Sequence, residues 1–275
     1  MKVLVDIESF KLYRIGSVRL MDDNSFQSFS KMHVYFYGED VSRLLELALT
    51  SVNKSVKKFS ILDLGCGDGT LIFALYEKGL LGNAQEIVGV DISEDRIERL
   101  RSNLLFVKGV VSDALDVKQL PDSSFDFVIC AQLIEHVEND RALVLGIKRL
   151  LKSGGFAYIS SVIKKWWGTY IYFKEGAFRL DPTHVREYSS EQEFIDVIAG
   201  EEFEIMNVET HPASFPLLDL IVRLSIKIGL AEPDVGFYQR HRNLSKLREL
   251  RLPVIGYEIV EALVRKPCEQ ASCFC

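Results

Sequence analysis

The sequence predicts an α/β protein in which a mostly parallel β-sheet is covered by helices on both faces. Short apolar runs alternate with amphipathic, helix-like stretches over about a hundred residues, between residues 59 and 162, and this alternation is typical of parallel sheets with helical crossovers. Acidic or glycine-rich segments come directly after several of the apolar runs. They would therefore gather at the carboxyl edge of the sheet, where ligands bind in such folds.

The first strand, turn and helix carry the most information. The apolar run at residues 59–64 leads into a turn with Gly65, Gly67 and Gly69, and an amphipathic stretch follows at residues 71–80. Glycines let the backbone approach a ligand closely and adopt positive φ at little cost, and the N-terminus of a helix favours an anionic group. Such a sequence can also be only a turn, so the spacing must identify the ligand.

The spacing differs from two common nucleotide-binding motifs. A dinucleotide-binding G-x-G-x-x-G would need a last glycine where Thr70 stands, and the lysine of a phosphate-binding loop is missing. The segment D-x-G-x-G-x-G from Asp63 instead resembles the first motif of class I S-adenosylmethionine (SAM) dependent methyltransferases. That resemblance implies that Asp63 faces the aminocarboxypropyl end of SAM. It also implies close backbone approach at four turn residues: Gly65, Cys66, Gly67 and Gly69.

Acidic residues also follow the next two expected strands. Asp91 closes the run at residues 87–92, where a carboxylate can accept both hydroxyls of a ribose; alternatively it only caps the helix that starts at Ser93. Asp113 follows the third expected strand, residues 104–111. The resemblance implies that Asp113 binds the adenine amino group and that Ile92 and Ala114 complete the cofactor contacts.

The fourth expected strand, residues 125–131, is followed by Gln132, which the resemblance places at the cofactor, and then by Glu135 and His136. These two are the nearest candidate bases for an acceptor hydroxyl, although the same pair is often only a helix start in this domain family. Ubiquinone-pathway O-methyltransferases resemble this segment and bind a metal through E-x-x-E-H. Because Gln132 replaces the first acid and an amide is a poorer ligand for a hard cation, no metal is expected.

A helix capped by Asn139 and ended by Gly154 and Gly155 precedes the fifth expected strand, residues 156–162. An aromatic segment at residues 164–178 follows and forms either a wall of the acceptor pocket or a hairpin packed on the sheet. Its candidate acceptor contacts are Trp166, Trp167 and Tyr170.

The run from His184 to Ser189 resembles the H-x-R-x-[YF]-[ST] segment of type 11 methyltransferase domains, with Ser189 capping the next helix. His184 is a second candidate base or a hydrogen-bonded hinge residue. Arg186 and Tyr188 are further candidate acceptor contacts.

The sixth and seventh strands are expected at residues 203–209 and 254–264, the seventh antiparallel and beside the sixth, with a helical insertion between them. The insertion's first helix, residues 214–230, has one polar stripe, so most of its surface needs cover. We expect it to act as a lid opposite the aromatic segment or to pack in a homodimer. The alternatives are a membrane contact through residues 214–251, with the head group of a lipid-linked acceptor near Arg240 or Arg242, and RNA binding.

The whole chain divides into five expected parts. They are an N-terminal extension with a cap helix (1–54), a SAM-binding core (55–210), the helical insertion (211–252), the final strand (253–266) and a mobile tail (267–275).

Composition supports a cytoplasmic enzyme with one main domain, with membrane association as an alternative. The chain has 275 residues, of which 48% are hydrophobic, and a net charge of −6, which argues against broad binding to nucleic acid. We find neither a signal peptide nor an apolar stretch long enough for a membrane span. Cys66 and Cys130 are expected to be buried thiols, and the tail cysteines are expected to be reduced and free of zinc: Cys268, Cys273 and Cys275.

The resemblance covers roughly residues 55–210 and implies a Rossmann-like fold. It also implies SN2 transfer of a methyl group from SAM to a small-molecule, lipid or glycan acceptor, with O-methylation favoured and S-adenosylhomocysteine as product. The alternatives are a SAM-binding scaffold without activity, an RNA methyltransferase and an NAD-binding oxidoreductase. The residues do not identify the acceptor, because pocket shape determines it.

Overall fold

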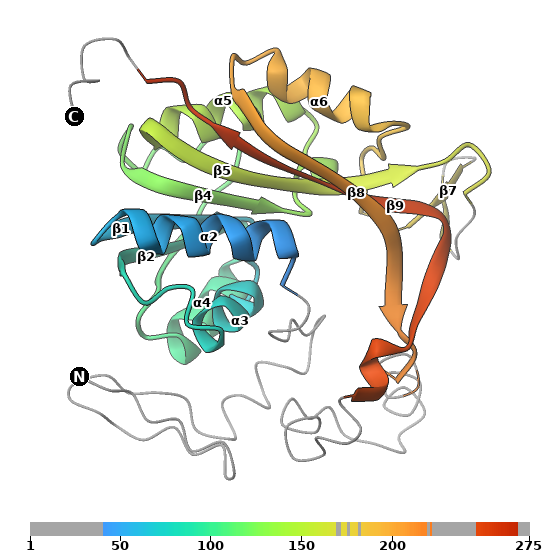
Figure 1. Cartoon of the computed structure of the whole chain (residues 1–275), viewed down its shortest axis with the longest axis horizontal. Coiled ribbons are helices and arrows are strands. Elements are labelled where there is room, and N and C mark those ends of the chain that lie inside the picture. The colour runs from blue at the N-terminus through green and yellow to red at the C-terminus, as the bar shows by residue number, and fades with distance from the viewer. Residues whose placement is uncertain are drawn as a thin grey trace.

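The computed structural model describes residues 41–168, 172–174, 177–180, 183–218, 221 and 246–268. Seven strands form one sheet in the order β3-β2-β1-β4-β5-β9-β8 (Figure 1). Strands β1 to β5 pair in parallel, and β9 is antiparallel to both of its neighbours. The predicted seven-stranded, mostly parallel sheet with an antiparallel last strand is therefore confirmed.

The strands of this sheet are β1 (Phe59–Leu64), β2 (Ala84–Asp91), β3 (Lys108–Val111), β4 (Phe125–Ala131), β5 (Leu151–Lys164), β8 (Glu204–Pro216) and β9 (Arg251–Arg265). A separate hairpin contains β6 (Tyr172–Lys174) and β7 (Ala177–Arg179). The α-helices are α2 (Arg43–Ser55), α3 (Thr70–Glu77), α4 (Glu94–Asn103), α5 (Asp140–Leu150) and α6 (Glu191–Ala199), and the 3-10 helices are η2 (Ile134–His136) and η3 (Lys246–Glu249).

Helices cover both faces of the sheet, as predicted. Apolar residues of α2, α3 and α4, among them Leu49, Leu75 and Leu100, form one core with the side chain of Phe59. The opposite core contains Ile147 of α5 and residues of α6 (Figure 1). The central strands β1 and β4 therefore have apolar cover on both sides, which explains their nearly continuous hydrophobic sequences.

Side-chain caps fix where these helices begin. Ser93 accepts a hydrogen bond from the backbone N–H of Arg96, and Asn139 accepts one from Ala142, so both expected caps are found. The cap of α6 is Ser190 and not Ser189 as predicted. Ser189 instead donates its N–H and hydroxyl to the Glu193 carboxylate, at 2.8 and 2.6 Å, so the capping sequence is shifted by one residue.

Several predicted boundaries are wrong. The third strand begins at Lys108, because residues 104–107 form a turn in which the N–H of Val107 bonds to the carbonyl of Leu104. The helix before β5 ends at Leu150, and Gly154 and Gly155 lie inside that strand.

The predicted insertion starts too early and ends too late, because residues 211–216 belong to β8 and residues 251–252 to β9. Pro212 and Pro216 lie within this part of β8, although proline disfavours a strand. They are tolerated because β8 is the edge strand, where a missing N–H leaves no partner unpaired. In Figure 1 these two strands bend away together from the rest of the sheet.

Much of the predicted lid lies outside the described residues. Residues 217, 218 and 221 are helical. The polar stripe of Asp219, Arg223 and Lys227 lies outside the described residues, as do Arg240 and Arg242, Tyr170, Cys273, Cys275 and residues 1–40. The aromatic segment does contain a hairpin, β6–β7. Within the described part of the chain, every helix is too short or too polar to cross a bilayer.

One buried polar network fastens α2 to the sheet. Glu261 of β9 accepts hydrogen bonds from Ser42, which also caps α2, at 2.6 Å and from Tyr158 at 2.9 Å. His211 lies 3.5 Å from the same carboxylate. Burial alone would raise the pKa of Glu261, but these hydrogen bonds together lower it below its ordinary value.

Candidate functional site

The glycine turn between β1 and α3 adopts the backbone that only glycine accepts readily. Gly65, Gly67 and Gly69 have φ values of 83°, 54° and 84°, in the left-handed region. The N–H groups of Gly65 and Cys66 donate to the carbonyl of Val90 in the neighbouring strand, at 2.8 and 2.9 Å. This attachment fixes the turn at the carboxyl edge of the sheet.

A cavity of about 250 Å³ lies beside this turn. Its lining residues are Asp63, Gly65, Cys66, Gly67, Asp68, Thr70, Leu71, Arg96, Ala131 and Gln132. A Cβ atom at Gly67 would meet only the end of the Arg96 side chain, at 3.6 Å, and the Gly67 backbone lines the cavity. The cavity brings together five predicted cofactor residues, and its location agrees with the rule that ligands bind beyond the carboxyl ends of parallel strands.

Asp63 is the buried acid of this cavity. Asp63 is 3% exposed, and its Oδ2 has no hydrogen-bond partner among the described residues. Burial, together with the charge of Asp91, raises the pKa of Asp63 to about 7. A buried carboxylate oxygen without a partner is costly unless a ligand supplies one, so this position fits a positively charged group.

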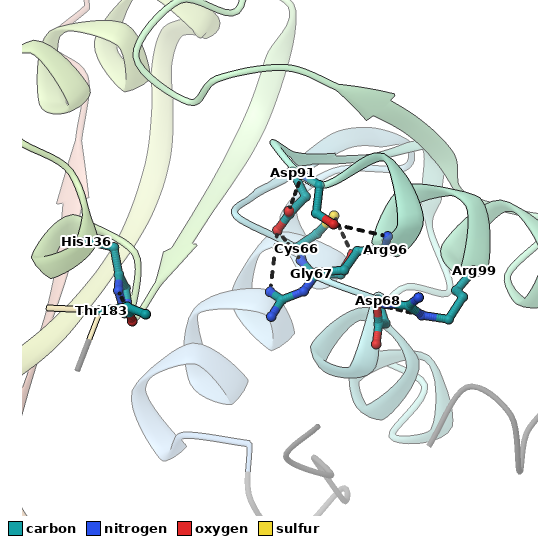
Figure 2. A network of polar contacts seen from close by, with 9 residues as sticks. Cys66, Gly67, Asp68, Asp91, Arg96, Arg99, His136 and Thr183 are labelled. Carbon is teal, nitrogen blue, oxygen red and sulfur yellow. Dashed lines mark hydrogen bonds and ion pairs between the residues drawn. The ribbon is translucent and has the colours of Figure 1, made fainter. Parts of the chain in front are cut away.

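Asp91 lies at the end of β2, where its two oxygens are held apart. Oδ2 accepts a hydrogen bond from the N–H of Gly67 at 2.9 Å, and Oδ1 accepts one from Ser93 at 2.8 Å. Arg96 lies 4.0 Å from Oδ2 (Figure 2). Asp91 therefore supports the start of α4 and also presents a carboxylate beside the glycine turn, so the two roles weighed for it are compatible.

The sequence reasoning missed the neighbouring acid, Asp68. This buried residue lines the cavity, and its Oδ1 accepts hydrogen bonds from Arg99 at 3.0 and 3.3 Å (Figure 2). The pair ties the glycine turn to α4. The only sign of this role in the sequence is an acidic residue between two glycines. The pairing with Arg99, 31 positions later, cannot be predicted from a helical or strand repeat.

Asp113, Ile92 and Ala114 lie outside the residues that line this cavity. Asp113 is exposed, and its Oδ1 accepts a hydrogen bond from Leu115 at 2.9 Å. The N–H of Ser112 bonds to the carbonyl of Asp91 at 3.0 Å, which brings the end of β3 beside the end of β2. Ile92 is 72% exposed there, so an adenine-binding role at this edge remains a prediction.

A second polar cluster follows β4 and contains all three candidate bases. Glu135, His136 and His184 each have one nitrogen or carboxylate oxygen within 4.8 Å of the others. Glu135 is fully buried, its Oε2 accepts a hydrogen bond from Ser161 at 3.0 Å, and Oε1 has no partner among the described residues. Burial raises the pKa of Glu135 to about 7. Its hydrogen bonds and the His184 ring lower this pKa, but their effect is smaller than that of burial.

The backbone joins the two segments of this cluster. The carbonyl of Glu135 accepts hydrogen bonds from the N–H groups of Val185 and Arg186, at 2.9 and 3.2 Å. The hydroxyl of Thr183 lies 3.1 Å from Nδ1 of His136 (Figure 2), and the rings of His136 and His184 meet edge-on at 4.8 Å. Of the three candidate bases, only His136 is half-buried, so it alone is open to an acceptor.

Two of the predicted acceptor contacts are bonded to other residues of the protein. Tyr188 is 2% exposed and donates its hydroxyl to Asp140 at 3.1 Å. Arg186 pairs with the same carboxylate at 2.7 Å and also donates to the carbonyl of Glu138. We correct this prediction for Tyr188, because burial in the core removes it from any acceptor. Trp166 and Trp167 are exposed, at 94% and 49%, and remain candidates.

Glu135, His136 and His184 are close enough together to hold a metal ion, but some of their donor atoms are already used within the protein. Nδ1 of His184 is already 2.9 Å from Glu187, and Oε2 of Glu135 is used by Ser161. The amide of Gln132 donates to the hydroxyl of Ser160 at 3.3 Å. The expectation that activity needs no metal therefore stands as a prediction.

The two cysteines within the core are buried free thiols, as predicted. Burial raises the pKa of the Cys66 thiol and the Cys130 thiol well above the ordinary value. Both are therefore unreactive packing residues at neutral pH.

Comparison with known proteins agrees with this geometry. The family described as "Methyltransferase domain" matches residues 55–211. The ubiquinone biosynthesis O-methyltransferase of Idiomarina loihiensis is 31% identical over 113 residues, which cover 38% of this chain and 44% of the relative. The chain thus spans less than half the length of this curated relative.

Solved structures share the fold. The [4+2]-cyclase SpnF superposes with a TM-score of 0.58 at 17% identity, over 90% of this chain and 93% of the cyclase. A phosphoethanolamine N-methyltransferase of Haemonchus contortus, determined with S-adenosylhomocysteine, gives a TM-score of 0.54 at 17% identity, over 83% of this chain and 53% of the other. At this identity the likeness shows the fold alone.

Proposed function

The chain belongs to the methyltransferase domain family, and from this premise we propose that it transfers a methyl group from SAM to a hydroxyl of a small-molecule acceptor. The observation that carries the proposal is the buried, unpartnered oxygen of Asp63 at the cavity beside the glycine turn. SAM carries a positively charged ammonium group, and the buried carboxyl group of Asp63 lines this cavity. The N–H groups at the start of α3 suit its carboxylate.

Residues of the cavity and the adjoining Asp91, which is hydrogen-bonded to Gly67, would each bind a different part of the cofactor. Asp63 would accept the ammonium group and Asp91 the ribose hydroxyls, while the glycine turn admits the aminocarboxypropyl chain. SAM, when bound, supplies an electrophilic methyl group on a good leaving group, so alignment is the main requirement on the protein. Domain limits at 55–210 for this core, with a cap helix before it and a final strand at 253–266, are part of the same proposal.

His136 is the residue that would take the proton of an acceptor hydroxyl. When the acceptor oxygen takes the methyl group from the sulfur of SAM, the O–H proton would pass to the imidazole of His136. Glu135, buried beside it, would stabilise the imidazolium. The half-buried position of His136 supports this assignment over His184 and Glu135, which are nearly or fully buried.

Calorimetry with SAM, S-adenosylhomocysteine and NAD in parallel tests the cofactor. We expect the first two to bind and NAD not to bind; saturable NAD binding alone would refute the proposal. Transfer of labelled methyl is then measured to a catechol, a prenylated catechol and an amine. We expect transfer to the catechols, and His136→Asn should lower it by about 10²–10⁴-fold without weakening SAM binding.

A catalytically inactive SAM-binding scaffold is the second candidate. The fold is compatible with it, because a neighbour of the same fold is a cyclase and fold alone does not determine reaction. The intact glycine turn and acids favour an enzyme. Binding of SAM without transfer to any acceptor of the panel would favour the scaffold.

An acceptor with a hydrophobic part is the finer form of the proposal. It is supported by the O-methyltransferase relative, named for ubiquinone biosynthesis. Exposed apolar side chains around the end of β8 and the start of β9 also support it: Phe215, Leu250 and Leu252. This finer proposal has three further parts. Residues 214–251 contact a membrane surface, the protein forms a homodimer, and it is located in the cytoplasm. Sedimentation with anionic liposomes tests the membrane contact, and failure to sediment would refute it.

A further inference from the structure

Glu187 is a buried carboxylate next to the candidate catalytic cluster. Its side chain is 6% exposed. Oε1 accepts a hydrogen bond from the N–H of Leu180 at 2.7 Å and lies 2.9 Å from Nδ1 of His184. Oε2 lies 3.5 Å from the hydroxyl of Tyr257 in β9 and 3.8 Å from Nζ of Lys164 in β5. Donors from three parts of the fold therefore hold this carboxylate against His184.

This arrangement determines which ring nitrogen of His184 carries the proton. A carboxylate accepts hydrogen bonds, so a neutral His184 beside it carries its proton on Nδ1, and Nε2 is then an acceptor. In metal sites and catalytic triads a carboxylate of this kind sets both the tautomer and the ring orientation of a histidine. Here the oriented ring is nearly buried and meets His136 edge-on.

The same contacts hold His136 in place. Thr183 precedes His184 and contacts the His136 ring, and the backbone after His184 bonds to the carbonyl of Glu135. A shift of His184 would therefore move the segment that contacts His136. The charged or titratable groups around the two rings are Glu135, Glu187, Lys164, Arg186 and Asp140.

We propose that Glu187 is a positioning residue of the methyl transfer, which acts through His184 to orient and electrostatically support His136. The inference rests on the proposed function. Glu187 itself receives no proton: the proton of the acceptor hydroxyl stays on His136 until solvent removes it. The negative carboxylate favours the imidazolium of His136 from the far side of the His184 ring, because opposite charges in a partly dehydrated site attract more strongly than in water.

The test is ¹⁵N NMR of protein labelled at its five histidines, recorded with S-adenosylhomocysteine from about pH 5 to about pH 9. His136→Asn and His184→Asn assign the two signals. In the wild type we expect His184 to show the Nδ1–H tautomer. In Glu187→Gln this signature should be lost, and the titration midpoint of His136 should fall by about half to one pH unit.

Glu193→Gln is the matched control, because it makes the same change on the surface six residues later, and it should leave both signals unchanged. Glu187→Asp keeps the charge and should preserve the His136 midpoint more closely than Glu187→Gln does. Two results would overturn the inference: an Nε2–H tautomer at His184 in the wild type, or equal His136 midpoints in the wild type and Glu187→Gln. The first needs no variant, so it stands even if Glu187→Gln fails to fold.

These results are separate from the test of the proposed function. Glu187→Gln should bind SAM within about twofold of the wild type, because Glu187 lies outside the cofactor cavity. With a catechol acceptor, it should transfer methyl about 10–100-fold more slowly, as for other partners that orient a functional histidine. Loss of SAM binding by the wild type would refute the proposed function and leave the NMR result intact.

Discussion

Asp63→Asn should make the protein more stable above neutral pH while weakening its binding of SAM. Burial raises the pKa of Asp63 from 3.8 to about 7, about three units, which corresponds to at most ~4 kcal/mol. Between these two values the folded state keeps a proton that the unfolded state has released. Folding stability therefore falls as pH rises through this interval, and the full cost is present above pH 7.

Asparagine removes the charge but leaves a buried polar group, at a cost of roughly 1–3 kcal/mol. The net gain for Asp63→Asn at about pH 8 is then ~1–3 kcal/mol, or a rise of roughly 2–10 °C in the melting temperature of a protein of this size. The gain should shrink towards pH 5, because the wild-type carboxyl is then largely neutral in the folded state. Thermal unfolding across this pH range measures both effects.

Calorimetry measures the opposing effect on the cofactor. SAM should bind Asp63→Asn about 10–100-fold more weakly, because the hydrogen bond from a charged ammonium contributes ~1.5–3 kcal/mol. Near pH 6 the wild type should release a proton on binding, seen as a dependence of the heat on the buffer, and the variant should not.

Asp116→Asn, an exposed aspartate paired with Lys118, is the control and should change neither property. If Asp63→Asn matched the wild type in melting temperature at pH 8 and in SAM affinity, Asp63 would be neither desolvated nor part of the cofactor site.

Three other predictions follow from the same structure. Asp91→Ala should weaken SAM binding by ~1.5–3 kcal/mol. Gly67→Val should also weaken it, because φ is positive at Gly67 and the side chain would enter the cavity. Unchanged calorimetric affinity in folded variants would contradict the cofactor assignment. Methyl transfer should persist in EDTA, because Gln132 replaces an acid of the metal-dependent relatives; loss of activity with recovery in magnesium would disprove this. The hydrogen-bonded Glu261 has a lowered pKa, so its contribution to stability is present above its unfolded pKa and is lost as pH falls through its folded pKa. Ser42→Ala should therefore cost ~1–3 kcal/mol near neutral pH and less in acid; an equal loss at both pH values in urea unfolding would count against the network.

The sequence predicted best where local geometry determines structure. Only glycine adopts the backbone of Gly65, Gly67 and Gly69 readily, and a parallel sheet brings the segments after its strands to one edge. The family, the sheet and the position of the cavity followed from these two facts. The caps Ser93 and Asn139 were predictable for the same reason, because they act within three residues.

Prediction failed where structure depends on partners far away in the sequence. Pro212 and Pro216 disfavour a strand by themselves, and only their place at the sheet edge makes one. Tyrosine is suited both to packing in a core and to contacting an acceptor, so the sequence did not distinguish these roles for Tyr188. Its burial beside Asp140 could not be predicted from the sequence. Glu187 was overlooked because its partners come from β5, β9 and its own segment.

The acids of the two clusters show why residue type alone could not assign the chemistry. Asp63 is the second-last residue of β1 and Glu135 follows β4, and these strands are neighbours. Each carboxyl is buried with one oxygen unpartnered, and burial raises the pKa of each to about 7. At neutral pH each is therefore divided between its charged and neutral forms, and an adjacent positive charge shifts it to the charged form. SAM would bring that charge to Asp63 on binding, whereas His136 would bring it to Glu135 only when it takes the acceptor proton. The first acid would thus respond to the cofactor and the second to the reaction, a difference that depends on their surroundings and not on the residues themselves.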